Sequence, residues 1–368
     1  MKRLIGSFGF VLLAAALTTR ADEPSSIERR LYVAEPGIRD YLEYGGHGVL
    51  VHDIDHGHRF LKRIPITGVD PKGKPLNIKG ICASAVTRRL YVSTTRQLMC
   101  LDLETEKPIW EKSYPEGCDR MSITPDGKRL FVPSLEGVLW NVVRGEDGAV
   151  ESQIIPKSGA HNTIVDLDGR RAYLAGLKST DLTIVSAIDL KPVIKVGPFS
   201  NVIRPFTINR AATRCYVNLN GLLGFEIGDM TTGKNLGRVE VKGFSTGPTK
   251  RHGCPSHGIA LSPDEKEIWL TDAHNSSLHI FDATQSPPVQ KESITLKDQP
   301  GWITFSIDGR YAYPSTGDVI DARSRKIVAT LKDEHGQDVQ SEKMMEIDFA
   351  GGKPVQVGDQ FGLGRASP

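Results

Sequence analysis

The sequence predicts an all-β fold, a seven-bladed β-propeller of four-stranded antiparallel blades. Three observations lead to it: a short aromatic strand motif that recurs along the chain, its spacing of 40 to 59 residues, and acidic or Asp-Gly turns between the strands. A period of about 40 to 45 residues with four short strands per unit is typical of propeller blades. The ring is expected to close by pairing of the N- and C-terminal segments.

The recurring motif is an apolar or basic residue, an aromatic residue, a further apolar residue and then a turn. The seven copies are "RLYVAEP" at Tyr32, "RLYVSTT" at Tyr91, "RLFVPSL" at Phe131, "RAYLAGL" at Tyr173, "RCYVNLN" at Tyr216, "EIWLTDA" at Trp269 and "YAYPSTG" at Tyr313. The intervals between successive aromatic residues are 59, 40, 42, 43, 53 and 44 residues. Each copy therefore marks one blade.

The segments between the aromatic motifs supply the other strands and turns of each blade. A strand that ends in an acidic turn follows the aromatic strand, as in "LMCLDLE" and "LHIFDAT", and a later strand leads into "ITPDGK", "VDLDGR", "LSPDEK" or "FSIDGR". Asp-Gly and Pro-Asp turns provide the positive-φ geometry that joins adjacent antiparallel strands. No segment has a sustained 3.6-residue apolar period, so little helix is expected.

The combination of "RLYV" with "GIALSPDEK" resembles the YVTN-repeat β-propeller family of exported bacterial proteins. The resemblance spans about Arg30 to Phe361. It implies the propeller fold but little about activity, because the family includes surface proteins and many exported members with no assigned activity. The segment "MMEIDFAGGKPVQV" is expected to be an innermost strand that pairs with strands from Leu31 onward. A ring closed in this way leaves no free sheet edges.

The N-terminus has the features of a secretory signal. Lys2 and Arg3 precede an apolar run over residues 4–17, and small residues follow at the expected cleavage point. We therefore predict that residues 1–21 are a removed signal peptide and that residues 22–368 form a single propeller domain, periplasmic or secreted. The apolar run is too short for a comfortable membrane span, so no membrane span is expected.

Composition argues against several classes of partner and cofactor. Without Lys2, Arg3 and Arg20 the 46 basic residues fall to 43, against 44 acidic ones. A nucleic-acid binder normally has a basic excess, so no nucleic-acid partner is expected. The five cysteines are widely spread and odd in number, so at least one should be a free thiol, and the absence of CxxCH excludes a covalent c-type haem. We expect a monomer.

A site is expected at one face of the ring, here called the mouth, where the innermost strands of a propeller begin. Aligning the repeats places one residue at each of these starts: Lys79, Asp119, His161, Arg204, His257, Gly301 and Lys343. Five of these seven are cations or imidazoles, so the mouth is predicted to attract an anion. The alternative is that such mouths are polar and solvated in any propeller.

Two long loops are predicted to open on the same face. They are "AEPGIRDYLEYGGHG" and "GFSTGPTKRHGCPSH", and the second leads directly into His257. Insertions concentrated on one face usually mark the binding face. The candidate residues in the first loop and in one further loop on this side are Arg39, Tyr41, Tyr44, His47, His274 and Asn275.

The mouth residues are suited to acid-base chemistry on an acidic sugar. A uronate carboxylate would meet a cation of the ring, which lowers the cost of an adjacent carbanion. An imidazole with an ordinary pKa of about 6.5 is suited to removing the proton. The candidate catalytic residues are His257 and His161 as bases and Tyr41 and Tyr44 as acids. Some propeller-fold lyases and lactonases work in this way, but the analogy is one of fold and none of their motifs is matched here.

A divalent metal is a further hypothesis for the same face. The candidate ligands are His161, His257 and His274, since three imidazoles around an open position suit zinc, copper or manganese. No local signature such as HExxH accompanies them. The sequence contains no motif that identifies a cofactor.

We therefore expect an exported propeller whose mouth binds a small anionic or carbohydrate ligand, or an acidic loop of a protein partner. The alternative is a lyase, hydrolase or lactonase that acts on an acidic sugar with a histidine base and an Arg or Lys clamp on the carboxylate. Catalysis needs an imidazole, a cation and a tyrosine within roughly 3–6 Å of one bound group, whereas binding needs only a charged mouth. The sequence leaves open whether the protein is an enzyme.

Overall fold

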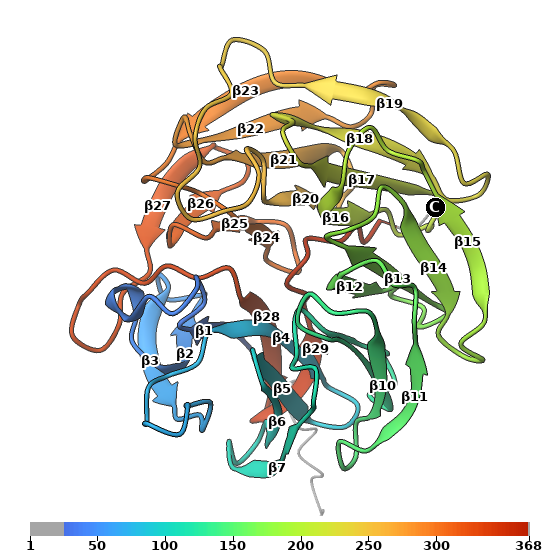
Figure 1. The fold of residues 1–368 in the computed structure, drawn as a ribbon. Coiled ribbons are helices and arrows are strands. Elements are labelled where there is room, and N and C mark those ends of the chain that lie inside the picture. Colours follow the sequence, from blue (N-terminus) through green and yellow to red (C-terminus); the bar gives the residue numbers. More distant parts are fainter. Residues whose placement is uncertain (1–25, 367–368) are drawn as a thin grey trace, which may run out of the picture.

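The chain forms seven antiparallel β-sheets arranged in a ring, a seven-bladed β-propeller (Figure 1). The computed structural model describes residues 26–366, and the predicted signal peptide lies outside them. Among the described residues the only helix is a short 3-10 turn, Leu42–Tyr44, and no described helix is long and apolar enough to cross a membrane. The predicted fold class and the scarcity of helix are confirmed.

Six blades consist of four consecutive strands, with the first strand of each nearest the axis of the ring (Figure 1). Blades two to four are β4 (Ile78–Ser84), β5 (Arg89–Thr94), β6 (Gln97–Asp102), β7 (Pro108–Ser113); β8 (Ser122–Ile123), β9 (Arg129–Pro133), β10 (Trp140–Arg144), β11 (Val150–Ile154); and β12 (Ala160–Val165), β13 (Arg171–Gly176), β14 (Leu182–Ser186), β15 (Pro192–Val196). Blades five to seven are β16 (Ile203–Ile208), β17 (Arg214–Leu219), β18 (Gly224–Asp229), β19 (Asn235–Glu240); β20 (Ile259–Leu261), β21 (Glu267–Asp272), β22 (Ser277–Asp282), β23 (Val289–Thr295); and β24 (Ile303–Phe305), β25 (Tyr311–Pro314), β26 (Asp318–Asp321), β27 (Lys326–Thr330).

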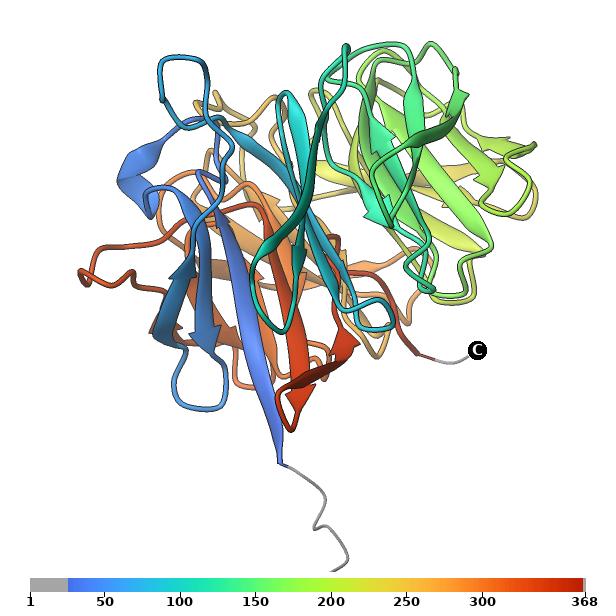
Figure 2. The ribbon, with the colours of Figure 1, turned by 90° about the horizontal axis from the view of Figure 1, so that it is seen from below.

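The first blade closes the ring and has one strand more than the predicted four. Its order is β29 (Lys353–Val357), β28 (Met344–Ala350), β1 (Ile27–Glu35), β2 (Gly48–Asp53) and β3 (Arg59–Ile64). β28 pairs antiparallel with β1, with Glu346 opposite Leu31, and the two strands lie side by side in Figures 1 and 2. The predicted pairing of the terminal segments is confirmed, and β29 is an addition to it.

The recurring aromatic residues occupy the same place in every blade. Each lies in the second strand of its blade, or in β1 of the closing blade, and is buried: Tyr32, Tyr91, Phe131, Tyr173, Tyr216, Trp269 and Tyr313. Burying a large apolar side chain contributes about 1.5–3 kcal/mol relative to leaving it exposed. The motif therefore marks the core of each blade.

The Asp-Gly turns join the innermost strand of a blade to the aromatic strand. Gly127, Gly169 and Gly309 have φ values of 71°, 67° and 71°. Glu265 occupies the same place in "SPDEK" with a φ of 60°. Positive φ is the geometry that these turns were predicted to need, and glycine adopts it without steric cost.

All five cysteines are free thiols and are buried. Burial raises the pKa of the Cys254 thiol to about 12. Because the thiolate is the nucleophilic form, Cys254 carries no reactive sulfur at neutral pH even though it lies only three residues from His257.

Candidate functional site

The seven aligned ring positions all lie at the starts of innermost strands, as the alignment of the repeats predicts. Lys79, His161 and Arg204 are the second residues of β4, β12 and β16. The other four lie one to three residues before β8, β20, β24 and β28: Asp119, His257, Gly301 and Lys343. Several of these residues contact one another as buried pairs rather than lining an open ring.

One of these pairs joins Asp119 to His161. The Nδ1 atom of His161 lies 2.6 Å from Oδ2 of Asp119, and the Lys79 ammonium lies 3.3 Å from Oδ1. Burial alone would raise the pKa of Asp119, but His161 and Lys79 lower it to about 2. Burial also lowers the pKa of His161, against the opposing effect of Asp119. At neutral pH the ring is therefore neutral and donates its Nδ1 proton to the carboxylate, which leaves Nε2 as the basic atom.

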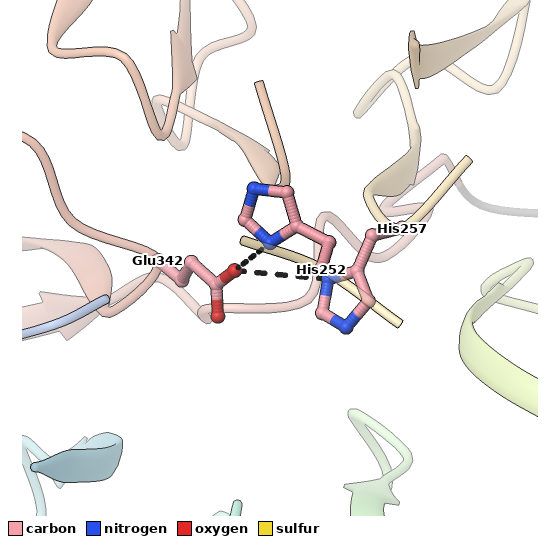
Figure 3. A group of neighbouring side chains, drawn as sticks. All are labelled: His252, His257 and Glu342. Carbon is pink, nitrogen blue, oxygen red and sulfur yellow. Dashed lines mark ion pairs between the residues drawn. The ribbon is translucent and has the colours of Figure 1, made fainter. Parts of the chain in front are cut away.

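A second group is centred on the buried carboxylate of Glu342 (Figure 3). Its Oε1 atom lies 2.9 Å from Nδ1 of His252 and 3.7 Å from Nδ1 of His257. Its Oε2 atom accepts hydrogen bonds from Arg120 and, at 2.8 Å, from Lys343. Burial would raise the pKa of Glu342, but Lys343 and Arg120 hold it well below its ordinary value. Glu342 is thus ionised, and it gathers residues from three separate loops.

The two imidazoles beside Glu342 are held in different ways. His252 has an acceptor at each ring nitrogen, with Gln299 O at 2.9 Å from Nε2 and Oε1 of Glu342 at 2.9 Å from Nδ1. The Nδ1 atom of His257 lies 2.8 Å from Gly301 O. Burial lowers the pKa of His257 well below its ordinary value, so this ring is neutral, donates from Nδ1 and keeps the Nε2 lone pair.

The side chains that face Glu342 are two cationic groups and an imidazole. Arg120, Lys343 and the ring of His252 surround this single carboxylate. Burial, followed by the nearby Arg120, lowers the pKa of Lys343 to about 7. The neighbouring Glu35 adds little negative charge, because burial raises its pKa well above the ordinary value. A low-dielectric environment with excess positive charge favours an anion.

Arg120 is the residue that links the two groups. Its guanidinium lies over the Trp302 ring at 4.0 Å from the centroid, and its Nη1 atom lies 3.4 Å from Oδ1 of Asn162. Arg120 is 3% exposed and Asn162 1%. Arg120 Nε and Asn162 Nδ2 are buried donors that no acceptor in the described part of the chain reaches. Buried donors are nearly always hydrogen-bonded in native proteins, so this pair points to an acceptor from outside the chain. We call the following residues the mouth cluster: Lys79, Asp119, Arg120, His161, His252, His257, Glu342 and Lys343.

The chemistry of His252, His257 and Glu342 does not favour a metal ion, although their ligand atoms lie within 4.8 Å of one another. The nitrogen of His257 that faces Glu342 is Nδ1, and its proton is already donated to Gly301 O. Arg120 and Lys343 on the same carboxylate would repel a further cation. Of the three predicted metal ligands only His257 belongs to this group. His161 pairs with Asp119, and His274 is an exposed residue whose ring covers Gly247.

The two predicted tyrosine acids lie in a cap beside the mouth cluster. Arg251, next to His252, donates to the Tyr44 hydroxyl and, at 3.0 Å, to Gln340 Oε1, and it lies 4.7 Å over the Tyr44 ring. Tyr41 packs edge-on against Tyr44 at 6.1 Å. Among the described residues no hydrogen bond joins either tyrosine to His161 or His257. The cap therefore brings three loops together near Glu342.

The other predicted ligand residues support the loops around the cluster. Arg39 donates to the Arg251 carbonyl at 3.2 Å, and Arg204 donates to Gly253 O at 3.2 Å. Asn275 donates to Ser245 O at 2.9 Å. His47 lies beside Arg63 at the outer side of the first blade, where burial lowers its pKa. Arg39, Arg204 and Asn275 therefore hold the loop that carries His252 in place.

Four residues of this site were not predicted from the sequence, which are Arg120, Asn162, Glu342 and Trp302, whereas His252 lies in the second loop predicted to open on the mouth. Arg120 follows the ring position Asp119, and Glu342 precedes the ring position Lys343. β8 begins only at Ser122 and β28 at Met344, so the alternation of side chains in a regular strand does not apply to these neighbours. The sequence signal that could have identified Arg120 and Glu342 is that each lies next to a ring position of opposite charge.

Gly301→Ala is expected to disrupt the site locally. A Cβ atom at this position would lie 1.9 Å from Cε1 of His252, so the ring must move away from Glu342. We expect a loss of about 1–3 kcal/mol in the free energy of unfolding, measured by urea denaturation. In a double-mutant cycle with His252→Ala the cost should largely disappear. An equal cost in the absence of the ring would show that the backbone, rather than His252, is responsible.

Comparison with known proteins gives no family or functional assignment. No family model and no curated protein matches the chain. Among solved structures the chain is similar to hydrazine synthase of Kuenenia stuttgartiensis, with 13% sequence identity and a TM-score of 0.45 over 68% of this chain and 94% of that one. A likeness this distant carries no argument about function.

Proposed function

We propose that the protein is an exported propeller of the YVTN-repeat type that binds a small anionic ligand, an acidic carbohydrate by class, at the mouth cluster. The observation that carries this proposal is Arg120, a buried arginine whose Nε atom has no acceptor in the described chain. A guanidinium N–H donates a strong, charge-assisted hydrogen bond to a carboxylate. The nearby Asn162 offers a second unused donor, Nδ2.

The surroundings of Arg120 support the same ligand class. Trp302 stacks on the guanidinium and Glu342 fixes one of its amino groups, so the orientation of Arg120 is set before a ligand arrives. Preorganised donors lose little entropy on binding. A bound carboxylate would also add negative charge near Lys343 and would raise the pKa of Lys343.

A lyase, hydrolase or lactonase acting on an acidic sugar is the second candidate, and the His161–Asp119 pair favours it. Asp119 orients the ring through Nδ1, which leaves Nε2 as a general base. Asn162, the neighbour of His161, presents its free donor to the same region. A substrate carboxylate held by Arg120 would then lie near a base. Turnover of a uronate oligosaccharide or lactone that His161→Gln abolishes would establish this candidate.

Export to the periplasm or outside the cell, cleavage after residue 21 and a monomeric state remain part of the proposal. Export and cleavage rest on the basic and apolar pattern of residues 1–21. An acidic loop of a partner protein is the other anionic ligand that the mouth cluster would accept.

Calorimetric titration with glucuronate and galacturonate tests the proposal, with glucose and galactose as neutral counterparts. We expect one saturable site for the acids and none for the neutral sugars. Arg120→Lys keeps the charge but removes Nε and the planar fork, and it should weaken binding by about tenfold or more. Lys250→Ala, on an exposed loop residue, should change the affinity less than about twofold.

Two results would contradict this account. Equal binding of acidic and neutral sugars would remove the role of the carboxylate, and unchanged affinity in Arg120→Lys would remove the role of Arg120. Failure of all four sugars to bind would overturn the small acidic sugar as the ligand and leave the partner loop.

A further inference from the structure

The last described segment of the chain, residues 358–365, lies across the ends of the innermost strands that are opposite to the mouth. Gly362 O accepts a bond from Leu261 N at 2.9 Å, and Gly364 N donates to Ile208 O at 3.0 Å. Leu261 and Ile208 are the last residues of β20 and β16, whereas the mouth cluster lies at the strand starts. Phe361 and Leu363 are buried in the core formed with Trp302. This segment, which we call the tail, therefore covers the ends of β16 and β20 and lines a pocket on the same side of the ring.

Gln360 is the tail residue that reaches furthest toward the site. It is 1% exposed and connects three blades. Its Oε1 atom accepts from Ile81 N at 3.4 Å, and its Nε2 atom donates to Met121 O at 3.2 Å. Its backbone carbonyl accepts the Nε1 proton of Trp302.

Gln360 contacts two neighbours of Arg120. Met121 directly follows Arg120 in the chain, and Trp302 is the ring on which the guanidinium lies. A buried indole N–H usually finds an acceptor, and one without an acceptor is costly. Gln360 thus restrains both the backbone beside Arg120 and the surface beneath it.

We propose that Gln360 is a positioning residue for the anion site. Gln360 has no contact with the ligand in this account. It acts by holding Trp302 and the Arg120 segment so that Nε of Arg120 is presented to the mouth. This inference rests on the proposed anion-binding function, and its experiment is chosen so that the two can fail separately.

Gln360→Ala removes both side-chain bonds, and Leu363→Ala is the matched control. Leu363 is a buried tail residue of the same core, and its apolar side chain makes no hydrogen bond, so its truncation loosens the tail and leaves the bonds of the Gln360 side chain in place. Two quantities are measured in the full chain: the fluorescence of Trp302, taken as the difference from the corresponding Trp302→Phe proteins, and the affinity for galacturonate.

We expect the Trp302 emission to shift in Gln360→Ala and to stay unchanged in Leu363→Ala, while both variants lose stability toward urea. The affinity for galacturonate should fall about tenfold in Gln360→Ala and less than about twofold in the control. Gln360→Glu, which keeps Oε1 and loses the Nε2 donor, should fall between the two. An unchanged Trp302 emission in Gln360→Ala would overturn the inference even if the wild-type protein binds no anion, and equal affinity losses in both alanine variants would reduce Gln360 to a structural residue.

Discussion

Glu342→Gln is expected to lower the free energy of unfolding by about 3–5 kcal/mol at pH 7.5, the largest effect of any single substitution considered for the site. The reason is charge. Arg120, Lys343 and His252 converge on this one carboxylate, and all of them are nearly inaccessible to water. A glutamine of the same shape leaves the Arg120 guanidinium buried without a counter-charge. Urea denaturation followed by circular dichroism measures the change.

The matched control for this prediction is Glu334→Gln. Glu334 also holds an arginine, Arg63, through two bonds of 2.7 and 2.6 Å, but the pair lies at the surface. Exposed ion pairs contribute about 0–1 kcal/mol, so this variant should remain close to the wild type. Saturating galacturonate should recover part of the stability lost in Glu342→Gln, because an anion supplies the missing charge. A loss no larger than that of the control would refute the charge balance assigned to the mouth cluster.

Asp348→Asn is expected to stabilise the protein increasingly as the pH rises from 5 to 8, by about 1–3 kcal/mol at the upper end. Asp348 and Glu346 lie two residues apart on β28, at the seam where the ring closes, and Arg29 of β1 bonds Glu346 at 2.9 Å. Oδ1 of Asp348 is buried and has no hydrogen-bond partner in the described chain. Burial raises the pKa of Glu346 to about 7, Arg29 opposes the shift and Asp348 adds to it. Burial also raises the pKa of Asp348.

The sign follows from proton linkage. Between its ordinary value and about 7, Glu346 binds more protons in the folded state than in the unfolded state, so the wild type loses this stability as the pH rises through that window. Asparagine removes the like charge and supplies a donor to Glu346. The buried imidazoles His52 and His58 on the same side of the first blade have pKa values lowered by burial to about 4 and titrate with the opposite sign. The measured quantity is therefore the difference between variant and wild type in the free energy of unfolding by urea at each pH. A difference independent of pH would contradict the repulsion assigned to Glu346 and Asp348 at the seam.

The sequence predicted the fold through local patterns. Tyr91, Trp269 and their counterparts repeat at blade intervals, and the turns around Gly127 and Gly309 need only their own neighbours. The starts of the innermost strands follow from the same register, which is why Lys79, Asp119 and His161 were predicted together and do lie together. The closing strand β28 was also predicted from its pattern.

The rest of the site depends on contacts that no local pattern encodes. Arg120 and Glu342 are 222 residues apart and meet only because the ring closes. His252 reaches Glu342 from a long loop whose path is fixed by Arg251, Arg204 and Asn275. The tail follows the last strand and has no counterpart in the other blades, so the repeat gave no information about Gln360. The residues that could not be predicted lie in parts of the chain that do not follow the blade repeat.

A crystal structure of the protein with galacturonate at saturating concentration tests the central claim most directly, since that claim assigns a carboxylate to the two unused donors of the mouth cluster. We predict the carboxylate at about 3 Å from Nε of Arg120 and Nδ2 of Asn162, above the Trp302 ring. Galacturonate bound elsewhere, with these two donors satisfied by ordered water or by the protein itself, would contradict it.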